Sequence, residues 1–260
     1  MMHWVVYFLW YAVVGCTTAQ ETNDADCPAL MKLHFNQSEH DIFSPYIHYT
    51  RYKTEVPDLT SFTLNFWVLF DTLEQNATVF TYVEEQYGDT LISVKYVKSF
   101  GWGLEILDKK MLLRAPVNAG SWHHILVSWS GKLSGLTFWF DGDHIDTQLY
   151  TKDEVIPGGG IFRSGQTELS IAYWDGELEE KQPDEGLNGW LTLLSLDSKP
   201  FGIKKAATDE LHLVKQKVGY LMSTCSSPKV GGNLIDWQTT PQKGYGSVTV
   251  HLARDRCGHF

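Results

Sequence analysis

Two adjacent histidines are the first residues that could carry chemistry, in the stretch WHHILVSWSG at residues 122–131. The stretch runs through apolar or small residues over the length of a β-strand. Adjacent side chains in a strand point to opposite faces, so His123 and His124 cannot ligate one metal or relay one proton together. We therefore interpret the pair as packed strand residues and not as a site.

Other patterns that could support catalysis are missing from the sequence. It contains no G-x-S-x-G elbow, H-E-x-x-H motif, P-loop or C-x-x-C pair. In FDGDHID, residues 140–146, three aspartates have a calcium-like spacing, but the later glutamate is absent and Asp141-Gly142 predicts a type I′ hairpin turn. A strand with the paired carboxylates of a glycosidase is also absent. We expect no catalytic residues.

Short alternating strands are the elements that must position any functional residue. In SFTLNFWVLF, residues 61–70, Phe62, Leu64 and Phe66 share one face, which is the period-two pattern of a strand. Similar runs recur to residue 196, separated by Gly, Asp or Asn, without intervening helices. The pattern predicts an all-β, two-sheet antiparallel jelly-roll sandwich. One short helix is expected over residues 207–222, where apolar residues have helical spacing.

Composition and charge limit the function classes. The chain has 260 residues, of which 43% are hydrophobic and 20% charged, so it can bury a sizeable core. Its formal net charge is −10. Proteins that bind nucleic acid need a basic face to release counterions from the phosphates. We expect no nucleic-acid partner.

The first residues resemble a secretion signal. Residues 1–19 contain no Lys, Arg, Asp or Glu, and their apolar run is too short to span a bilayer. We expect a signal peptide cleaved after Ala19, a secreted extracellular chain, one domain at 20–260 and no membrane anchor. A lipid-modified Cys16 is the alternative.

Three cysteines and two sequons fit an extracellular compartment. Removal of the leader leaves Cys27, Cys225 and Cys257, which predicts one disulfide and one leftover thiol. The sequons at Asn36 and Asn76 predict exposed glycosylation sites.

Several segments together resemble the pentraxin family. HILVSWS, from His124, is similar to the pentraxin strand motif H-x-C-x-S/T-W, and GNLIDW, from Gly232, is similar to the closing motif G-N-V/I-x-x-W. The resemblance spans about residues 27–250, and further pentraxin-like segments follow in the same order from Pro57, Phe138 and Gly158. Laminin-G-like domains share the Trp-His-His and Asp-Gly pieces but not GNLIDW, so they are the alternative.

The resemblance implies a jelly roll with Trp129 buried between two sheets and Trp237 in the core. The intradomain disulfide of pentraxins would fall at Asn65 and Leu126, so that bridge is absent here. Longer pentraxins have a second bridge, from the start of the domain to a cysteine just before the closing motif, and the resemblance implies that it joins Cys27 to Cys225 here, with Cys257 left over.

The resemblance also implies a calcium site. Pentraxins bind calcium through acidic loop residues, and the calcium then holds anionic head groups such as phosphocholine. The possible calcium ligands here are Asp89, Glu168, Asp175 and Glu185. Thr167 and Leu169 replace two acidic positions of the motif, and each replacement removes charge that calcium binding needs. These replacements favour a calcium-independent binder.

The sequence therefore predicts a secreted, lectin-like pattern-recognition protein that binds and does not catalyse. Its partner would be an extracellular glycan, lipid head group or protein, bound by the loops at 84–90 and 166–186. The alternatives are a structural interaction module of laminin-G-like type and a β-sandwich glycoside hydrolase. Pentraxins form rings, so the resemblance also implies a homo-oligomer.

Overall fold

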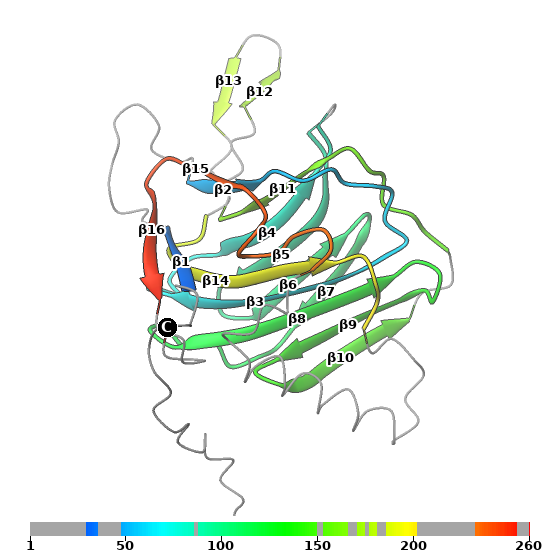
Figure 1. Cartoon of the computed structure of the whole chain (residues 1–260), viewed down its shortest axis with the longest axis horizontal. Helices are drawn as coiled ribbons and strands as arrows, with labels where there is room; N and C mark the ends of the chain where they lie inside the picture. The colour runs from blue at the N-terminus through cyan, green and yellow to red at the C-terminus, as the bar shows by residue number, and fades with distance from the viewer. Residues whose placement is uncertain are drawn as a thin grey trace, which may run out of the picture.

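The fold is an all-β jelly-roll sandwich of two seven-stranded antiparallel sheets, as predicted. It is seen in a computed structural model that describes residues 30–35, 48–85, 88–149, 153–165, 171–174, 177–180, 186–201, 232–253 and 260. Figure 1 shows one sheet in front of the other. A separate two-stranded ribbon, β12 (Ile171–Trp174) with β13 (Glu177–Glu180), projects from the sandwich in the same view.

The two sheets have different strand orders. Sheet A runs in the order β10 (Asp143–Leu149), β9 (Gly135–Phe140), β8 (Trp122–Ser130), β3 (Ser61–Phe70), β14 (Gly189–Asp197), β1 (Leu30–Phe35) and β16 (Val248–Ala253). Sheet B runs in the order β15 (Gln242–Tyr245), β2 (Tyr49–Tyr52), β11 (Ile161–Ser164), β4 (Ala77–Val83), β5 (Thr90–Val97), β6 (Gly101–Ile106) and β7 (Lys109–Leu113). The two edge strands β15 and β16 follow one another in the chain but belong to different sheets.

Strand β3 shows how alternation builds the core. Phe62, Leu64 and Phe66 are fully buried, and the Phe66 ring lies 6.4 Å from the ring of Trp102 on sheet B. The alternate residues of β3 face away from sheet B and yet are buried too, as in Trp67 at 6% exposure. The Trp67 ring lies 5.4 Å from the ring of Phe260. Sheet A is therefore covered on both sides near its middle.

Strand β8 pairs with β3 along its whole length. Trp129 is 1% exposed, and its ring lies 5.9 Å from that of Phe62 between the sheets. Asn65 of β3 lies directly opposite Leu126 of β8. The pentraxin resemblance places the two cysteines of the missing disulfide at these positions. A disulfide needs two neighbouring residues, and the pairing of β3 with β8 makes Asn65 and Leu126 neighbours.

The histidine pair lies in β8 with its side chains on opposite faces, as predicted. The ring of His123 stacks on Phe140, and the ring of His124 lies 5.2 Å from that of Trp67. Asp141 anchors both residues: its carboxylate accepts a hydrogen bond from His123 Nδ1 at 2.8 Å and another from the His124 amide at 2.7 Å. The pair is structural and shares no ligand.

The β9–β10 hairpin contains the predicted type I′ turn. Asp141 and Gly142 have φ angles of 48° and 84°, and a left-handed conformation at both central residues defines this turn type. Of the three aspartates of FDGDHID, Asp141 therefore lies in the turn and uses its carboxylate on the histidine pair, whereas Asp143 and Asp146 lie in β10.

The expected helix is not borne out. All the elements of the described residues are strands, and residues 207–222 lie outside them. The leader at 1–19, all the cysteines and Asn36 also lie outside the described residues, so the cleavage site and the Cys27–Cys225 pairing stay predictions. In the part of the chain that the structure describes, no helix is long and apolar enough to cross a membrane.

Candidate functional site

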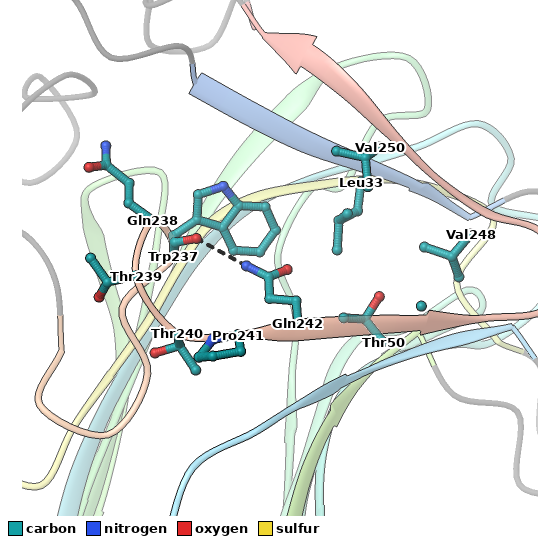
Figure 2. Close-up of a pocket in the computed structure, with 11 residues that line it drawn as sticks. Leu33, Thr50, Trp237, Gln238, Thr239, Thr240, Pro241, Gln242, Val248 and Val250 are labelled. Carbon is teal, nitrogen blue, oxygen red and sulfur yellow. Dashed lines mark hydrogen bonds between the residues drawn. The ribbon is translucent and has the colours of Figure 1, made fainter.

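A pocket of about 450 Å³ lies at one edge of the sandwich, between β15 of sheet B and β16 of sheet A (Figure 2). The chain crosses from one sheet to the other at Gly246-Ser247. The Ser247 amide donates a hydrogen bond of 2.8 Å to His48 Nδ1, and Gly246 has a φ of 67°, which favours glycine. We name this cavity the edge pocket.

The rim of the edge pocket is a tight turn that follows the GNLIDW motif. The Asp236 carboxylate accepts hydrogen bonds from the amides of Gln238 and Thr239, at 2.9 and 3.0 Å. The Asp236 amide donates to the Thr240 hydroxyl at 2.8 Å. Because these bonds satisfy the backbone locally, the turn presents Thr239 and Thr240 at fixed positions in the pocket lining.

The motif itself is held against β14. Main-chain hydrogen bonds join Ile235 to Leu196 in both directions, at 2.9 and 3.1 Å. A Cβ atom on Gly232 would lie 1.9 Å from the Leu196 carbonyl oxygen, so only glycine fits there. The close contact at Gly232 and the hydrogen bonds of Ile235 hold the motif against Leu196 of β14. Trp237, two residues further on, is 3% exposed and lies between the core and the edge pocket.

The polar wall of the edge pocket comes from sheet B. Figure 2 shows Thr50 and Gln242 on the side opposite Leu33 and Val250. The Gln242 Nε2 donates a hydrogen bond of 3.0 Å to the Trp237 carbonyl oxygen. Thr50 is 1% exposed, and its hydroxyl has no hydrogen-bond partner among the described residues. A buried hydroxyl without a partner is costly, so it favours a ligand group that can bond to it.

The apolar wall comes from sheet A. Leu33 of β1 and Val248 and Val250 of β16 line it, and Val250 is 63% exposed. Ligand pockets of several hundred Å³ typically combine such apolar walls with a few polar groups that fix orientation. The described lining contains no Asp, Glu, His or Cys. The pocket is therefore suited to binding a neutral molecule that has hydroxyl groups and an apolar face.

Only one of the four expected calcium ligands, Asp89, lies in the described residues. Asp89 lies exposed in the β4–β5 loop, where its carbonyl oxygen accepts a hydrogen bond of 2.9 Å from the Glu84 amide. Glu168, Asp175 and Glu185 lie outside the described residues. Within the described part, no group of three His, Cys, Asp or Glu side chains could hold a metal ion. Calcium takes six to eight oxygen ligands, so the position of Asp89 alone does not test the expected site, and calcium binding there stays a prediction.

The second sequon lies between β3 and β4. Asn76 is half-buried, less exposed than predicted, because its Oδ1 accepts a hydrogen bond of 2.9 Å from the Lys98 amide. Glycosylation at Asn76 stays a prediction, as does glycosylation at Asn36.

Sequence reasoning missed most of the edge pocket. It placed recognition on the loops at 84–90 and 166–186, and it named Trp237 only as a core residue. The stretch QTTPQKGYG, residues 238–246, held the usable signal: amide and hydroxyl side chains follow a tryptophan and precede glycine. Thr50 gave no signal, because its place in the pocket depends on the pairing of β2 with β15.

Comparison with known proteins agrees with this architecture. Residues 46–182 match the family model described as Concanavalin A-like lectin/glucanases superfamily, Laminin_G_3. Sushi, von Willebrand factor type A, EGF and pentraxin domain-containing protein 1 of Rattus norvegicus is 27% identical over 205 residues, which are 78% of this chain and 5% of that protein. Human neuronal pentraxin-1 is 25% identical over 208 residues, which are 77% of this chain and 42% of that protein.

These relatives confirm the resemblance to pentraxins, and the chain spans less than half the length of each. Among solved structures, the heptameric SAP-like pentraxin from Limulus polyphemus superimposes with a TM-score of 0.66 at 20% identity. The match covers 88% of this chain and 97% of that one. At this identity the likeness shows a shared fold.

Proposed function

We propose, from the premise that the chain belongs to the Concanavalin A-like lectin/glucanases superfamily, that it is a secreted binding protein which holds a glycan in the edge pocket. The observation that carries this proposal is the buried Thr50 hydroxyl, which lacks a partner among the described residues and lines the cavity between the two edge strands. Sugar hydroxyls can both donate to and accept from such a group.

The two walls of the edge pocket support a glycan over the other candidate ligands. A sugar ring has apolar C–H faces for Leu33 and Val248 and hydroxyl groups for Thr50 and Gln242. A lipid head group with a phosphate would need a cation, and none is present in the described lining. A glycosidase would need two carboxylates across the sugar, so the lining also supports binding over hydrolysis.

We further propose that this binding does not require calcium, because the edge pocket contains no carboxylate in its described lining. A metal-dependent ligand at the loops that carry Asp89 and Glu168 is the competing proposal. The two proposals predict different results: a chelator abolishes binding only at the metal-dependent loops, and a change at Thr50 weakens binding only in the edge pocket.

The test is a glycan array with the secreted protein, followed by calorimetry of the best glycan in calcium and in EDTA. We expect the affinity for the glycan to be unchanged in EDTA. The variant Thr50→Val should bind the glycan about tenfold more weakly, because the change removes one hydrogen bond and keeps the side-chain shape. Thr249→Val is the matched control, because Thr249 lies between the pocket-lining residues Val248 and Val250 and faces the other way. Binding lost in EDTA but unaffected by Thr50→Val would refute the proposal.

Secretion is part of the proposal and has its own test. The leader at 1–19 supports it, as do relatives that contain pentraxin domains. The expected result is a protein in the culture medium whose N-terminus begins at Gln20.

A further inference from the structure

Three cations lie side by side on the outer face of sheet B. Arg51 of β2 is directly opposite Lys243 of β15 on one side and Arg163 of β11 on the other. Cross-strand partners share a face, and neighbouring strands lie about 4.8 Å apart. We name Lys243, Arg51 and Arg163 the cation row. It lies on the face opposite to Thr50 and Tyr52, which point into the sandwich.

Charges of one sign directly opposite each other are unfavourable in a sheet. The described residues offer little compensation: Arg51 Nη2 lies 3.5 Å from Glu85 Oε1, and both side chains are well exposed, at 44% and 64%. Such an exposed ion pair contributes little. Arg163 is half-buried, and its Nε has no hydrogen-bond partner among the described residues. The cation row is thus a place where an anion would relieve repulsion and satisfy a buried donor.

Two tyrosines extend the cation row. Tyr49 and Tyr245 lie opposite each other, and their rings stack at 4.6 Å. The Arg163 guanidinium lies 5.3 Å from the centre of the Tyr49 ring, and the Lys243 ammonium 4.8 Å from that of Tyr245. These contacts hold the long cationic side chains against the sheet, so less conformational freedom is lost when a ligand binds.

We propose that the cation row and its two tyrosines form a second binding site, which takes an acidic sugar by direct contact with its carboxylate or sulfate and without a metal ion. Arginine forms bidentate hydrogen bonds with such groups, and tyrosine offers an apolar ring with a polar tip for the sugar itself. This site goes beyond the edge pocket and does not depend on it, since the two use opposite faces of β2 and β15.

A membrane surface fits the cation row less well. Surfaces that bind a bilayer firmly combine cations with exposed apolar side chains that enter it, because three cations alone contribute only about 1 kcal/mol each. In the described residues the three strands that carry the row, β2, β11 and β15, have no large exposed hydrophobic side chain; those of the described residues are Leu112, Leu133, Leu149, Val155, Val250 and Leu252. The row therefore favours a ligand in solution.

The test is calorimetry in EDTA with three tetrasaccharides: neutral maltotetraose, carboxylated hyaluronan tetrasaccharide and sulfated chondroitin tetrasaccharide. We expect one or both acidic sugars to bind, with affinity that falls as salt is added. The two acidic probes distinguish carboxylate from sulfate as the preferred group. Arg51→Gln and Lys243→Gln, at exposed positions, should each weaken that binding about tenfold, as expected for the loss of a charged hydrogen bond.

Two controls separate this site from charge effects and from the edge pocket. Lys110→Gln makes the same charge change on β7, where Lys110 pairs with Glu105 at 3.1 Å, and it should leave the acidic sugar bound. Thr50→Val should likewise have no effect here. Equal binding of the acidic sugars by the wild type and by the variant with all three cations changed to Gln would overturn the proposal. Equal binding of maltotetraose at the row, or row-dependent binding of phosphatidylserine vesicles in place of the acidic sugars, would overturn it too.

Discussion

His124 should make the protein less stable in mild acid. It is 1% exposed on the outer face of sheet A, beside Trp67, and neither ring nitrogen has a hydrogen-bond partner among the described residues. Burial lowers the pKa of His124 from its ordinary value of 6.5 to about 4, against a smaller opposing effect of the Asp141 carboxylate. The folded chain therefore keeps the ring neutral at a pH where the unfolded chain protonates it.

The size of the effect follows from the two pKa values. With 6.5 in the unfolded chain and about 4 in the folded one, stability is fully present above pH 6.5 and is lost as the pH falls toward 4. The free energy of unfolding should fall by about 2 kcal/mol between about pH 7.5 and about pH 5 through this residue alone. The loss should reach about 3 kcal/mol below pH 4.

The assay is urea unfolding of the wild type and of His124→Phe, followed by tryptophan fluorescence at both pH values. Phenylalanine fills similar space without a titrating group, so the variant should lose about 2 kcal/mol less than the wild type on acidification. His251→Gln is the matched control for the loss of one histidine, because His251 is exposed on the edge strand β16. The same pH dependence in His124→Phe and wild type would refute the reasoning.

Two further changes test the sandwich itself. Trp129→Ala, at a position 1% exposed between the sheets, should lower the free energy of unfolding by about 3 to 5 kcal/mol in a urea titration, and a loss below about 1 kcal/mol would contradict its core position. The double change Asn65→Cys with Leu126→Cys should form a disulfide, since the two residues are direct cross-strand partners. Closing a loop of about 60 residues should make the oxidised variant about 4 kcal/mol more stable than the reduced one, whereas a pair that stays reduced in air would contradict the register.

Local patterns were sufficient to predict much of the fold. The period-two pattern of β3 separates the buried Phe62, Leu64 and Phe66 from the residues on the other face. Asp141-Gly142 predicts its turn, because a type I′ turn needs two residues that tolerate positive φ. Local pattern could not show which residues cover the outer face of sheet A. Trp67 and His124 are both buried there, and the ring of Trp67 packs against Phe260, which is distant in sequence.

Neither binding surface could be predicted from the sequence, because each is assembled from distant strands. The edge pocket joins β1, β2 and the chain around Trp237, and the cation row joins β2, β11 and β15. Isolated cations such as Arg51 and Lys243 look like ordinary solvated residues in a chain of net charge −10. Only the register shows that they are neighbours.

The pair Asn65 and Leu126 shows how this chain can keep the sandwich without the disulfide that the family resemblance places there. Leu126 is fully buried, which contributes about 1.5 to 3 kcal/mol. The Asn65 side-chain amide donates a hydrogen bond to Ser195 Oγ on β14, which contributes about 1 kcal/mol more. Together these contributions are comparable with the 2 to 5 kcal/mol that loss of a native disulfide typically costs. The two replacements therefore act as a matched set, in which Leu126 fills the space beside β3 and Asn65 bonds to β14 on its other side. Leu126 can be read from the sequence as a core residue, but the role of Asn65 depends on a partner 130 residues away.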